Sequence, residues 1–155
     1  MKRIIKFGGA GVVLVLALMQ LANPSRVNPP VVSDLIAASS PPPRIAALFH
    51  SACYDCHSNE TKWPWYSRVA PISWLVAHDV TEGRQHLNFS EWPRQFPDRA
   101  ARRLDAISEA VENGEMPMAK YTAIHADARL SKEDRKLLSD WADAEADRVR
   151  PASAK

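Results

Sequence analysis

The chain has 155 residues, two of them cysteines, and carries 20 Lys and Arg against 18 Asp and Glu. This length fits a single domain with a modest hydrophobic core. The net charge of +2 is unevenly placed: Lys2, Arg3 and Lys6 open the chain, and the remainder from residue 23 onward holds 17 basic against 18 acidic groups. This balance argues against a nucleic-acid-binding protein, which needs a clustered basic surface.

An apolar run, FGGAGVVLVLALM, fills residues 7–19 behind these three positive charges. The pattern is typical of an export signal or a short membrane anchor, and a spanning helix needs about 17–25 apolar residues. Because Gln20, Leu21 and Ala22 make a poor cleavage site, we expect residues 1–22 to remain as a transmembrane helix with its basic end in the cytoplasm. Cleavage of this segment is the alternative, and in both cases the rest of the chain is exported.

Six of the twelve prolines fall within residues 23–43. Proline lacks a backbone N–H and fixes φ, so this segment is a poor candidate for a helix or an interior strand. We expect a semi-extended spacer here, and a disordered tail at residues 151–155.

Residues 44–150 are predicted to form an all-α domain, because they contain only two glycines, Gly83 and Gly114, and few β-branched residues. Helices are predicted over about residues 45–52, from Pro71 to about residue 80, from about Asp98 to a cap at Gly114, and from a capping-box-like pair at Ser131 and Asp134. The apolar positions expected to form the core are Ile45, Leu48, Phe49, Ala52, Ile72, Leu75, Val76, Val80, Ala100, Leu104, Ile107, Val111, Leu137, Leu138, Trp141 and Ala144.

Two aromatic-rich segments without helical periodicity lie between the predicted helices, at residues 63–66 and 86–92. Aromatic residues in such loops either complete a small core or wall a flat apolar cofactor pocket. The sequence leaves both interpretations open.

Both cysteines belong to one Cys-x-x-Cys-His motif, CYDCH at residues 53–57. A structural zinc site needs four ligands, and the chain has no second cysteine pair. A thioredoxin-like dithiol needs a βαβ setting that a helical chain lacks. The third interpretation is covalent c-type haem. A three-residue step puts both sulfurs on one side of a helical turn, and the next residue projects toward the metal.

In an exported chain the motif therefore predicts one covalent haem c, attached through Cys53 and Cys56, with His57 as an axial ligand of the iron. Phe49 stands one turn before Cys53, and we expect it to pack beside the haem and against Trp141 of the last helix. We also expect the second imidazole nitrogen of His57 to donate to a backbone carbonyl, with residues 63–71 as the natural source.

From about residue 44 to residue 144, the chain resembles the small bacterial haem-binding domain family of exported, cytochrome-like proteins. The resemblance is carried by residues 53–61 (CYDCHSNET), 63–67 (WPWYS), 70–71 (AP), 73–75 (SWL), 79–80 (DV), 82–84 (EGR), 87–92 (LNFSEW), 114–117 (GEMP), His125 and 130–131 (LS). It implies a small cytochrome-c-like helical domain around one covalently bound haem c. A bacterial origin would place this domain on the periplasmic side of the inner membrane.

The sixth ligand of the iron is predicted from the Met-Pro step before the last helix, where cytochromes of this general type place theirs. Met116 is the expected ligand, Met118 is the alternative, and His78 is a weaker candidate; His86 and His125 are weaker still. A His/Met pair raises the reduction potential relative to a bis-His pair.

Two basic side chains, Arg84 and Arg68, are candidates for pairing with a haem propionate, although a solvated surface charge is the more common role for a single Arg.

These features predict a carrier of single electrons rather than an enzyme, with haem as its cofactor, the membrane as its anchor site and a transient redox protein as its partner. The acidic residues Asp140, Asp143, Glu145 and Asp147 would steer a basic partner or simply form a solvated helix face. The alternatives are a haem sensor or peroxidase-like enzyme with a labile sixth ligand, and a module in which haem is mainly structural.

Overall fold

The structure is a computed structural model that describes residues 2–151. Within this range the chain is helical and forms no β-strand, only an isolated bridge between Ser33 and Glu91, which confirms the all-α prediction. All of the predicted tail except residue 151 lies outside the described residues. The helices are α1 (Lys2–Met19), η1 (Gln20–Ala22), α2 (Leu35–Ser39), α3 (Pro43–Ala52), α4 (Tyr54–His57), η2 (Trp65–Arg68), α5 (Ile72–His86), α6 (Pro97–Glu112), α7 (Ala119–Thr122), η3 (Ala126–Ala128) and α8 (Lys132–Val149).

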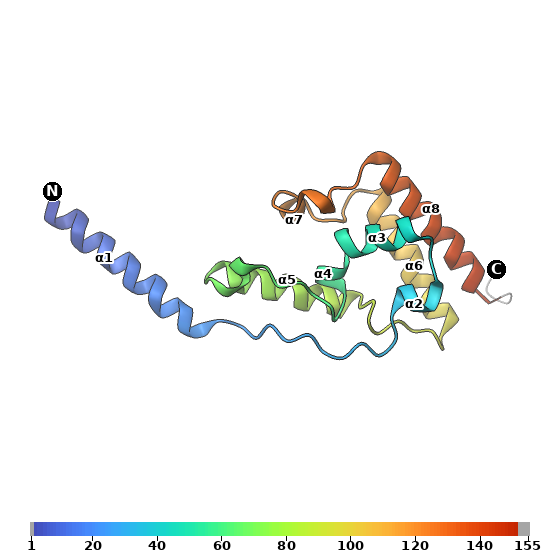
Figure 1. Ribbon diagram of the computed structural model, residues 1–155, viewed down its shortest axis with the longest axis horizontal. Coiled ribbons are helices and arrows are strands. Elements are labelled where there is room, and N and C mark those ends of the chain that lie inside the picture. Colours follow the sequence, from blue (N-terminus) through green and yellow to red (C-terminus); the bar gives the residue numbers. More distant parts are fainter. Residues whose placement is uncertain (1, 152–155) are drawn as a thin grey trace.

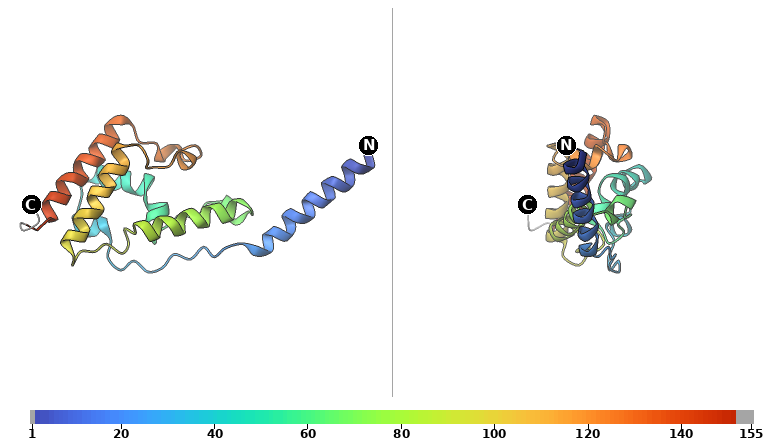
Figure 2. Two further views of the ribbon diagram at one scale, coloured as in Figure 1. Left: turned by 180° about the vertical axis from the view of Figure 1, so that it is seen from behind. Right: turned by 90° about the vertical axis from the view of Figure 1, so that its left-hand side faces the viewer.

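Helix α1 projects away from the other helices, and its C-terminal end lies beside the start of α5 (Figures 1 and 2). The side-chain amide of Gln20 accepts from the Ala70 N–H at 3.0 Å and donates to the Ala70 carbonyl at 3.2 Å. The indole N–H of Trp74 donates to the Ala22 carbonyl at 2.9 Å. Across residues 2–151, none of the helices has the length and apolarity needed to cross a membrane.

The proline-rich segment 23–43 is extended along much of its length but is not a free spacer. Leu35 is fully buried, and its N–H donates to the Phe89 carbonyl at 2.9 Å. The hydroxyl of Tyr54 donates to the carboxylate of Asp34 at 2.8 Å. The expectation of a mere spacer is therefore wrong, because composition shows where regular structure stops but does not show which surface the chain then follows.

The antiparallel helices α6 and α8 pack along their length and form one side of the core (Figure 1). The four apolar positions predicted for α6 are all buried, as its helical periodicity indicated. Gly114 adopts a φ of 74° just after the helix, a left-handed conformation that suits glycine. Ser131 caps α8 as predicted, because its hydroxyl accepts from the Asp134 N–H at 3.0 Å.

The buried face of α8 is rotated relative to the prediction. Leu138, Ala142 and Ala146 are buried at a spacing of four, whereas Leu137 is 38% exposed and Ala144 is exposed. Two adjacent leucines fit the periodicity in either register, and the small side chains at 142 and 146 decide it because they allow a close approach to α6.

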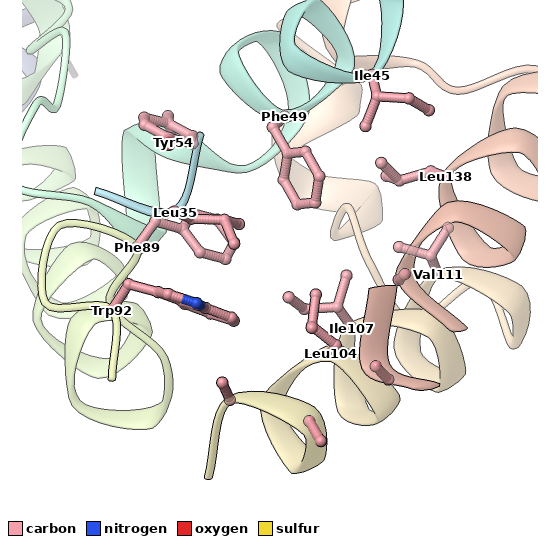
Figure 3. Packing of buried hydrophobic residues seen from close by; sticks show 14 residues of the cluster. Leu35, Ile45, Phe49, Tyr54, Phe89, Trp92, Leu104, Ile107, Val111 and Leu138 are labelled. Carbon is pink, nitrogen blue, oxygen red and sulfur yellow. The ribbon is translucent and has the colours of Figure 1, made fainter. Parts of the chain in front are cut away.

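Aromatic side chains form the centre of the core, where α3, α8 and the loop 87–92 meet (Figure 3). Phe49 is fully buried, with its ring centroid 5.4 Å from Trp141 and 5.5 Å from Phe89 in edge-to-face geometry. Such pairs stabilise a core beyond their buried area. The predicted contact between Phe49 and Trp141 is confirmed, and Trp92 in the same loop is 5% exposed.

Leu138→Ala should lower the free energy of unfolding by about 2–5 kcal/mol, because it leaves a cavity at a fully buried position. Leu137→Ala is the matched control on the neighbouring residue, and its effect should stay below about 1 kcal/mol because the side chain is 38% exposed. Urea unfolding of both variants measures the difference, and equal losses would contradict this register of α8.

Candidate functional site

The Cys-x-x-Cys-His motif forms a separate turn of helix, α4, at the end of α3. Cys53 joins the two helices with a φ of −129°, and its carbonyl accepts from the Cys56 N–H at 3.2 Å and the His57 N–H at 2.9 Å. This closed turn brings Cys53 and Cys56 together as half-buried free thiols. We call residues 53–57 the attachment turn.

The imidazole of His57 is held by two backbone carbonyls at the C-terminal part of α5. Its Nδ1 lies 2.9 Å from the Gly83 oxygen and 3.0 Å from the Leu87 oxygen. A carbonyl oxygen only accepts, so Nδ1 carries the hydrogen and a neutral ring has its lone pair on Nε2. That is the tautomer a metal-ligating histidine needs.

The expectation that a carbonyl fixes this ring is confirmed, but the predicted source, residues 63–71, is wrong. The acceptors come from α5 instead, 26 and 30 residues along the chain from His57. Burial lowers the pKa of His57, although both carbonyl contacts oppose that shift. The ring is therefore mainly neutral at pH 7.

Gly83 is a point of close approach between α5 and the attachment turn. A Cβ atom on Gly83 would lie 2.6 Å from the Cys56 carbonyl oxygen and 3.0 Å from its carbonyl carbon. Only glycine leaves room for this contact, and the contact in turn places the Gly83 carbonyl beside His57.

Both thiols keep their protons at neutral pH. Burial raises the pKa of Cys53 to about 12, with a further contribution from the neighbouring thiol. Burial also raises the pKa of Cys56 to about 11, helped by the charge of Asp55.

A mainly apolar hollow of about 650 Å³, including its open mouth, lies next to Cys56. Ligand pockets in proteins are mostly apolar, and the lining of this hollow has the same character. Its walls come from the attachment turn, residues 61–66, α5 and the segment around α7. The residues that line it are Asp55, Cys56, Thr61, Lys62, Pro64, Tyr66, Ile72, Leu75, Val76, Asp79, Val80, Met118, Lys120, Tyr121, Ile124 and His125.

The hollow explains why α5 departs from its predicted role in the core. Of its four apolar positions only Val80 is buried, while Ile72 is 48% and Leu75 is 51% exposed. All four line the hollow. Helix α5 therefore presents its apolar face to a space that an apolar cofactor would fill.

The structure brings Met118 to this hollow together with Cys56, whereas Met116 is absent from the lining. The backbone of Met116 is fixed at the end of α6, because its N–H donates to the Ala110 carbonyl at 3.0 Å and its carbonyl accepts from Arg135 at 2.9 Å. His78 is exposed on α5 outside the lining residues.

His125 lines the hollow, but both of its ring nitrogens are engaged. Nδ1 donates to the Tyr121 carbonyl at 3.0 Å, so Nε2 is left to accept from the Tyr66 hydroxyl at 2.9 Å. These contacts, together with a 2.8 Å hydrogen bond from the Tyr121 hydroxyl to Asp55, were not indicated by the sequence. The Tyr66–His125 contact joins residues 59 positions apart, and the Tyr121–Asp55 contact joins residues 66 positions apart.

The side chain of Arg84 donates hydrogen bonds to oxygen atoms of the protein itself. Its guanidinium donates to the Ser58 carbonyl at 2.8 Å, the Thr61 hydroxyl at 2.9 Å and the Asn28 amide oxygen at 2.9 Å. Burial lowers the pKa of Arg84. Arg84 therefore clamps the chain that follows the attachment turn onto the proline-rich segment, a role unlike the propionate contact considered from sequence.

The loop 87–92 is hydrogen-bonded to the attachment turn and to the residue Asn59 that follows it. The Phe89 N–H donates to the His57 carbonyl at 2.7 Å. The Asn88 side chain donates to the Asn59 amide oxygen at 3.0 Å, and the Asn59 N–H donates to the Ser90 hydroxyl at 2.9 Å. Segment 87–92 thus belongs to the core, whereas segment 63–66 supplies Pro64 and Tyr66 to the hollow.

These residues fit a haem: two neighbouring protonated thiols, an imidazole with a free Nε2 lone pair, and an apolar hollow that Cys56 lines. Residues 14–144 match the model of the family described as haem-binding domain. The chain belongs to the haem-binding domain family. A search of curated proteins and a search of solved structures returned no match.

Membership of the haem-binding domain family establishes haem as the ligand class. Among the described residues 2–151, no group of three or more His, Cys, Asp or Glu side chains is arranged to hold a metal ion by itself.

Gly83→Ala should destabilise the protein by about 1–3 kcal/mol, because its new Cβ meets the backbone of Cys56. The same change normally stabilises a helix interior by about 0.5–1 kcal/mol, so the sign of the effect is diagnostic. Thr81→Ala, at an exposed position of the same helix, is the control and should stay within about 0.5 kcal/mol. Thermal unfolding of both variants checks this, and a stabilised Gly83→Ala protein would contradict the contact.

Proposed function

We propose that the protein is an exported, membrane-anchored c-type cytochrome that carries single electrons through one covalently bound haem with His/Met ligation. The observation that supports this most directly is the His57 ring, whose Nδ1–H is held by the Gly83 and Leu87 carbonyls while Cys53 and Cys56 stand beside it as free thiols. When bound, the haem supplies reversible one-electron chemistry at its iron.

Cys53 and Cys56 would hold the haem through thioether bonds. The haem would supply two vinyl groups, and each thiol would add its S–H across one vinyl C=C bond. Such an addition would need no leaving group and no oxidant. The raised pKa values of both thiols keep the S–H form available.

The role of His57 would be to bind the iron through Nε2 while its two carbonyl contacts prevent rotation of the ring. A ligand fixed in this way needs little rearrangement when the charge of the iron changes. The Nδ1–H contacts also increase the electron density of the imidazole and so its basicity.

A methionine of the Met116-Pro117-Met118 segment would supply the sixth ligand. The Met-Pro pattern favours Met116, as the sequence predicts, whereas the lining of the hollow favours Met118. The histidine alternatives have less support, because both nitrogens of His125 are engaged and His78 lies outside the hollow. A thioether ligand also fits an apolar, mostly uncharged pocket.

Electron transfer has more support than a sensor or peroxidase-like function. Peroxidase-like chemistry needs an open sixth position and a distal base with a free lone pair, and the Tyr66 hydroxyl already occupies Nε2 of His125. The open mouth of the hollow would let the cofactor edge approach a partner.

The acidic residues of α8 do not form an uncompensated patch for such a partner. Glu145 is buried and paired with Arg148, Asp140 is paired with Lys136, and Asp147 lies 3.8 Å from Arg150. We therefore do not assign partner docking to this run.

A location on the periplasmic side of the inner membrane is proposed on the basis of the N-terminal segment. Three basic residues precede the apolar run 7–19, and the apolar side chains from Val12 to Val15 are exposed. This pattern favours an anchor at the membrane, with export as a soluble protein as the alternative.

Cys53→Ala combined with Cys56→Ala should abolish haem that resists denaturation, because neither thioether can form. The measurement is haem staining after denaturing electrophoresis of protein made with the haem-attachment machinery present. The single variants serve as controls and should each retain one bond. Staining of the double variant equal to that of the unchanged protein would refute haem c.

Met116→Ala and Met118→Ala, made separately, should show which of the two methionines is the sixth ligand. Loss of the weak sulfur-to-iron absorption band in the oxidised holoprotein is expected in only one of them, with a lower reduction potential because the softer thioether is lost. Loss only in the Met118 variant would overturn the sequence-based assignment to Met116. An unchanged band in both variants would refute methionine ligation.

A further inference from the structure

The segment that carries both methionines has little hydrophobic burial of its own. In this segment, residues 116–125, only Pro117 is buried, whereas Ala119, Lys120 and Ala123 are exposed and Ile124 is 66% exposed. A stretch with so few buried apolar contacts belongs to the low-stability part of a fold. Its position must therefore depend on specific polar contacts.

Three such contacts connect this methionine segment to the opposite wall of the hollow. Tyr121 donates to Asp55, His125 accepts from Tyr66, and Lys120 pairs with Asp79 on α5 at 2.8 Å. All six side chains line the hollow. In Figures 1 and 2, the ribbon of α7 lies across from the ribbon of α5.

The contact between Tyr121 and Asp55 is the one that reaches the attachment turn itself. Asp55 stands between Cys53 and Cys56 in the motif, and one carboxylate oxygen accepts from the Lys62 N–H at 2.9 Å. The other oxygen accepts from the Tyr121 hydroxyl at 2.8 Å. A hydrogen bond to an ionised acceptor is stronger than one between neutral groups.

The Tyr121 ring is in turn supported by His125. The two rings stack with centroids 4.0 Å apart and planes 20° apart. The carbonyl of Tyr121 accepts from Nδ1 of the same His125, whose Nε2 is held by the Tyr66 hydroxyl. Ring, backbone and hydroxyl of Tyr121 are thus all fixed, and the backbone N–H of Tyr121 donates to the Met118 carbonyl at 3.0 Å.

We propose that Tyr121 and Asp55 form a positioning pair that holds the methionine segment against the attachment turn and so keeps the sixth ligand on the iron. This inference rests on the proposed His/Met function, and it holds for Met116 and Met118 alike. The pair acts through the ligand-bearing segment and takes no part in covalent attachment or in binding by His57.

The test is Tyr121→Phe in the holoprotein, which removes the hydroxyl and keeps the ring stacked on His125. Carbon monoxide binds only when the sixth ligand has left the reduced iron, so its association rate reports how often the segment opens. Loss of a hydrogen bond to a charged acceptor predicts an increase of about 10- to 100-fold in this rate. The sulfur-to-iron band should weaken in parallel, while denaturation-resistant haem staining is unchanged.

Asp34→Asn is the matched control, at a residue outside the attachment turn. The Asp34 carboxylate also accepts from a tyrosine hydroxyl at 2.8 Å, that of Tyr54, but Asp34 does not line the hollow. Its replacement should lower the stability by a similar amount and leave the carbon monoxide rate within about twofold of the unchanged protein. Equal rates for Tyr121→Phe and Asp34→Asn would overturn the proposal, since a general loss of stability would then explain the effect.

Asp55→Asn provides a second, independent variant if Tyr121→Phe yields too little holoprotein. It should raise the carbon monoxide rate in the same direction, and adding Tyr121→Phe to it should change the rate little further. Fully additive effects would show that the two residues do not act as a pair. Rapid carbon monoxide binding to the unchanged protein would instead refute the proposed function, which separates the two failures.

Discussion

The attachment turn and the C-terminal part of α5 meet without an intervening side chain. Gly83 allows α5 to approach the backbone of Cys56, and this approach places the carbonyls of Gly83 and Leu87 at Nδ1 of His57. The orientation of the imidazole, the position of both thiols and the apolar wall that α5 gives to the hollow all depend on this one contact. Family membership identifies the ligand class as haem.

The neighbouring segments support the same contact between α5 and the attachment turn. The loop 87–92 continues directly from α5, and its Phe89 binds the His57 carbonyl and packs on Phe49, which in turn meets Trp141 of α8. Arg84 and the buried Leu35 bring the proline-rich segment onto the same region. A change in the packing of the α6–α8 pair would thus be transmitted to His57 through three aromatic rings.

Local features of the site were predictable from the sequence, and long-range ones were not. Helical periodicity predicted the buried face of α6. Two helix ends were predicted from Ser131 and Gly114, and the spacing of the motif predicted the attachment turn. The carbonyl partners of His57 and the Tyr121–Asp55 bond lie 26 to 66 residues away along the chain, and no periodic pattern reports such distances. The same limit explains Leu35, whose burial depends on which surface an extended segment follows, and the rotation of α8, where Leu137 and Leu138 fit two registers equally well.

The visible absorption spectrum of the reduced holoprotein, recorded before and after addition of carbon monoxide, tests the central claim most directly. A covalent haem c with His57 and a methionine as ligands predicts a low-spin spectrum that carbon monoxide does not change on the timescale of mixing. A rapid shift on mixing would contradict the His/Met site and favour an open sixth position. A protein purified without any haem spectrum, although the attachment machinery was present, would contradict the site as a whole.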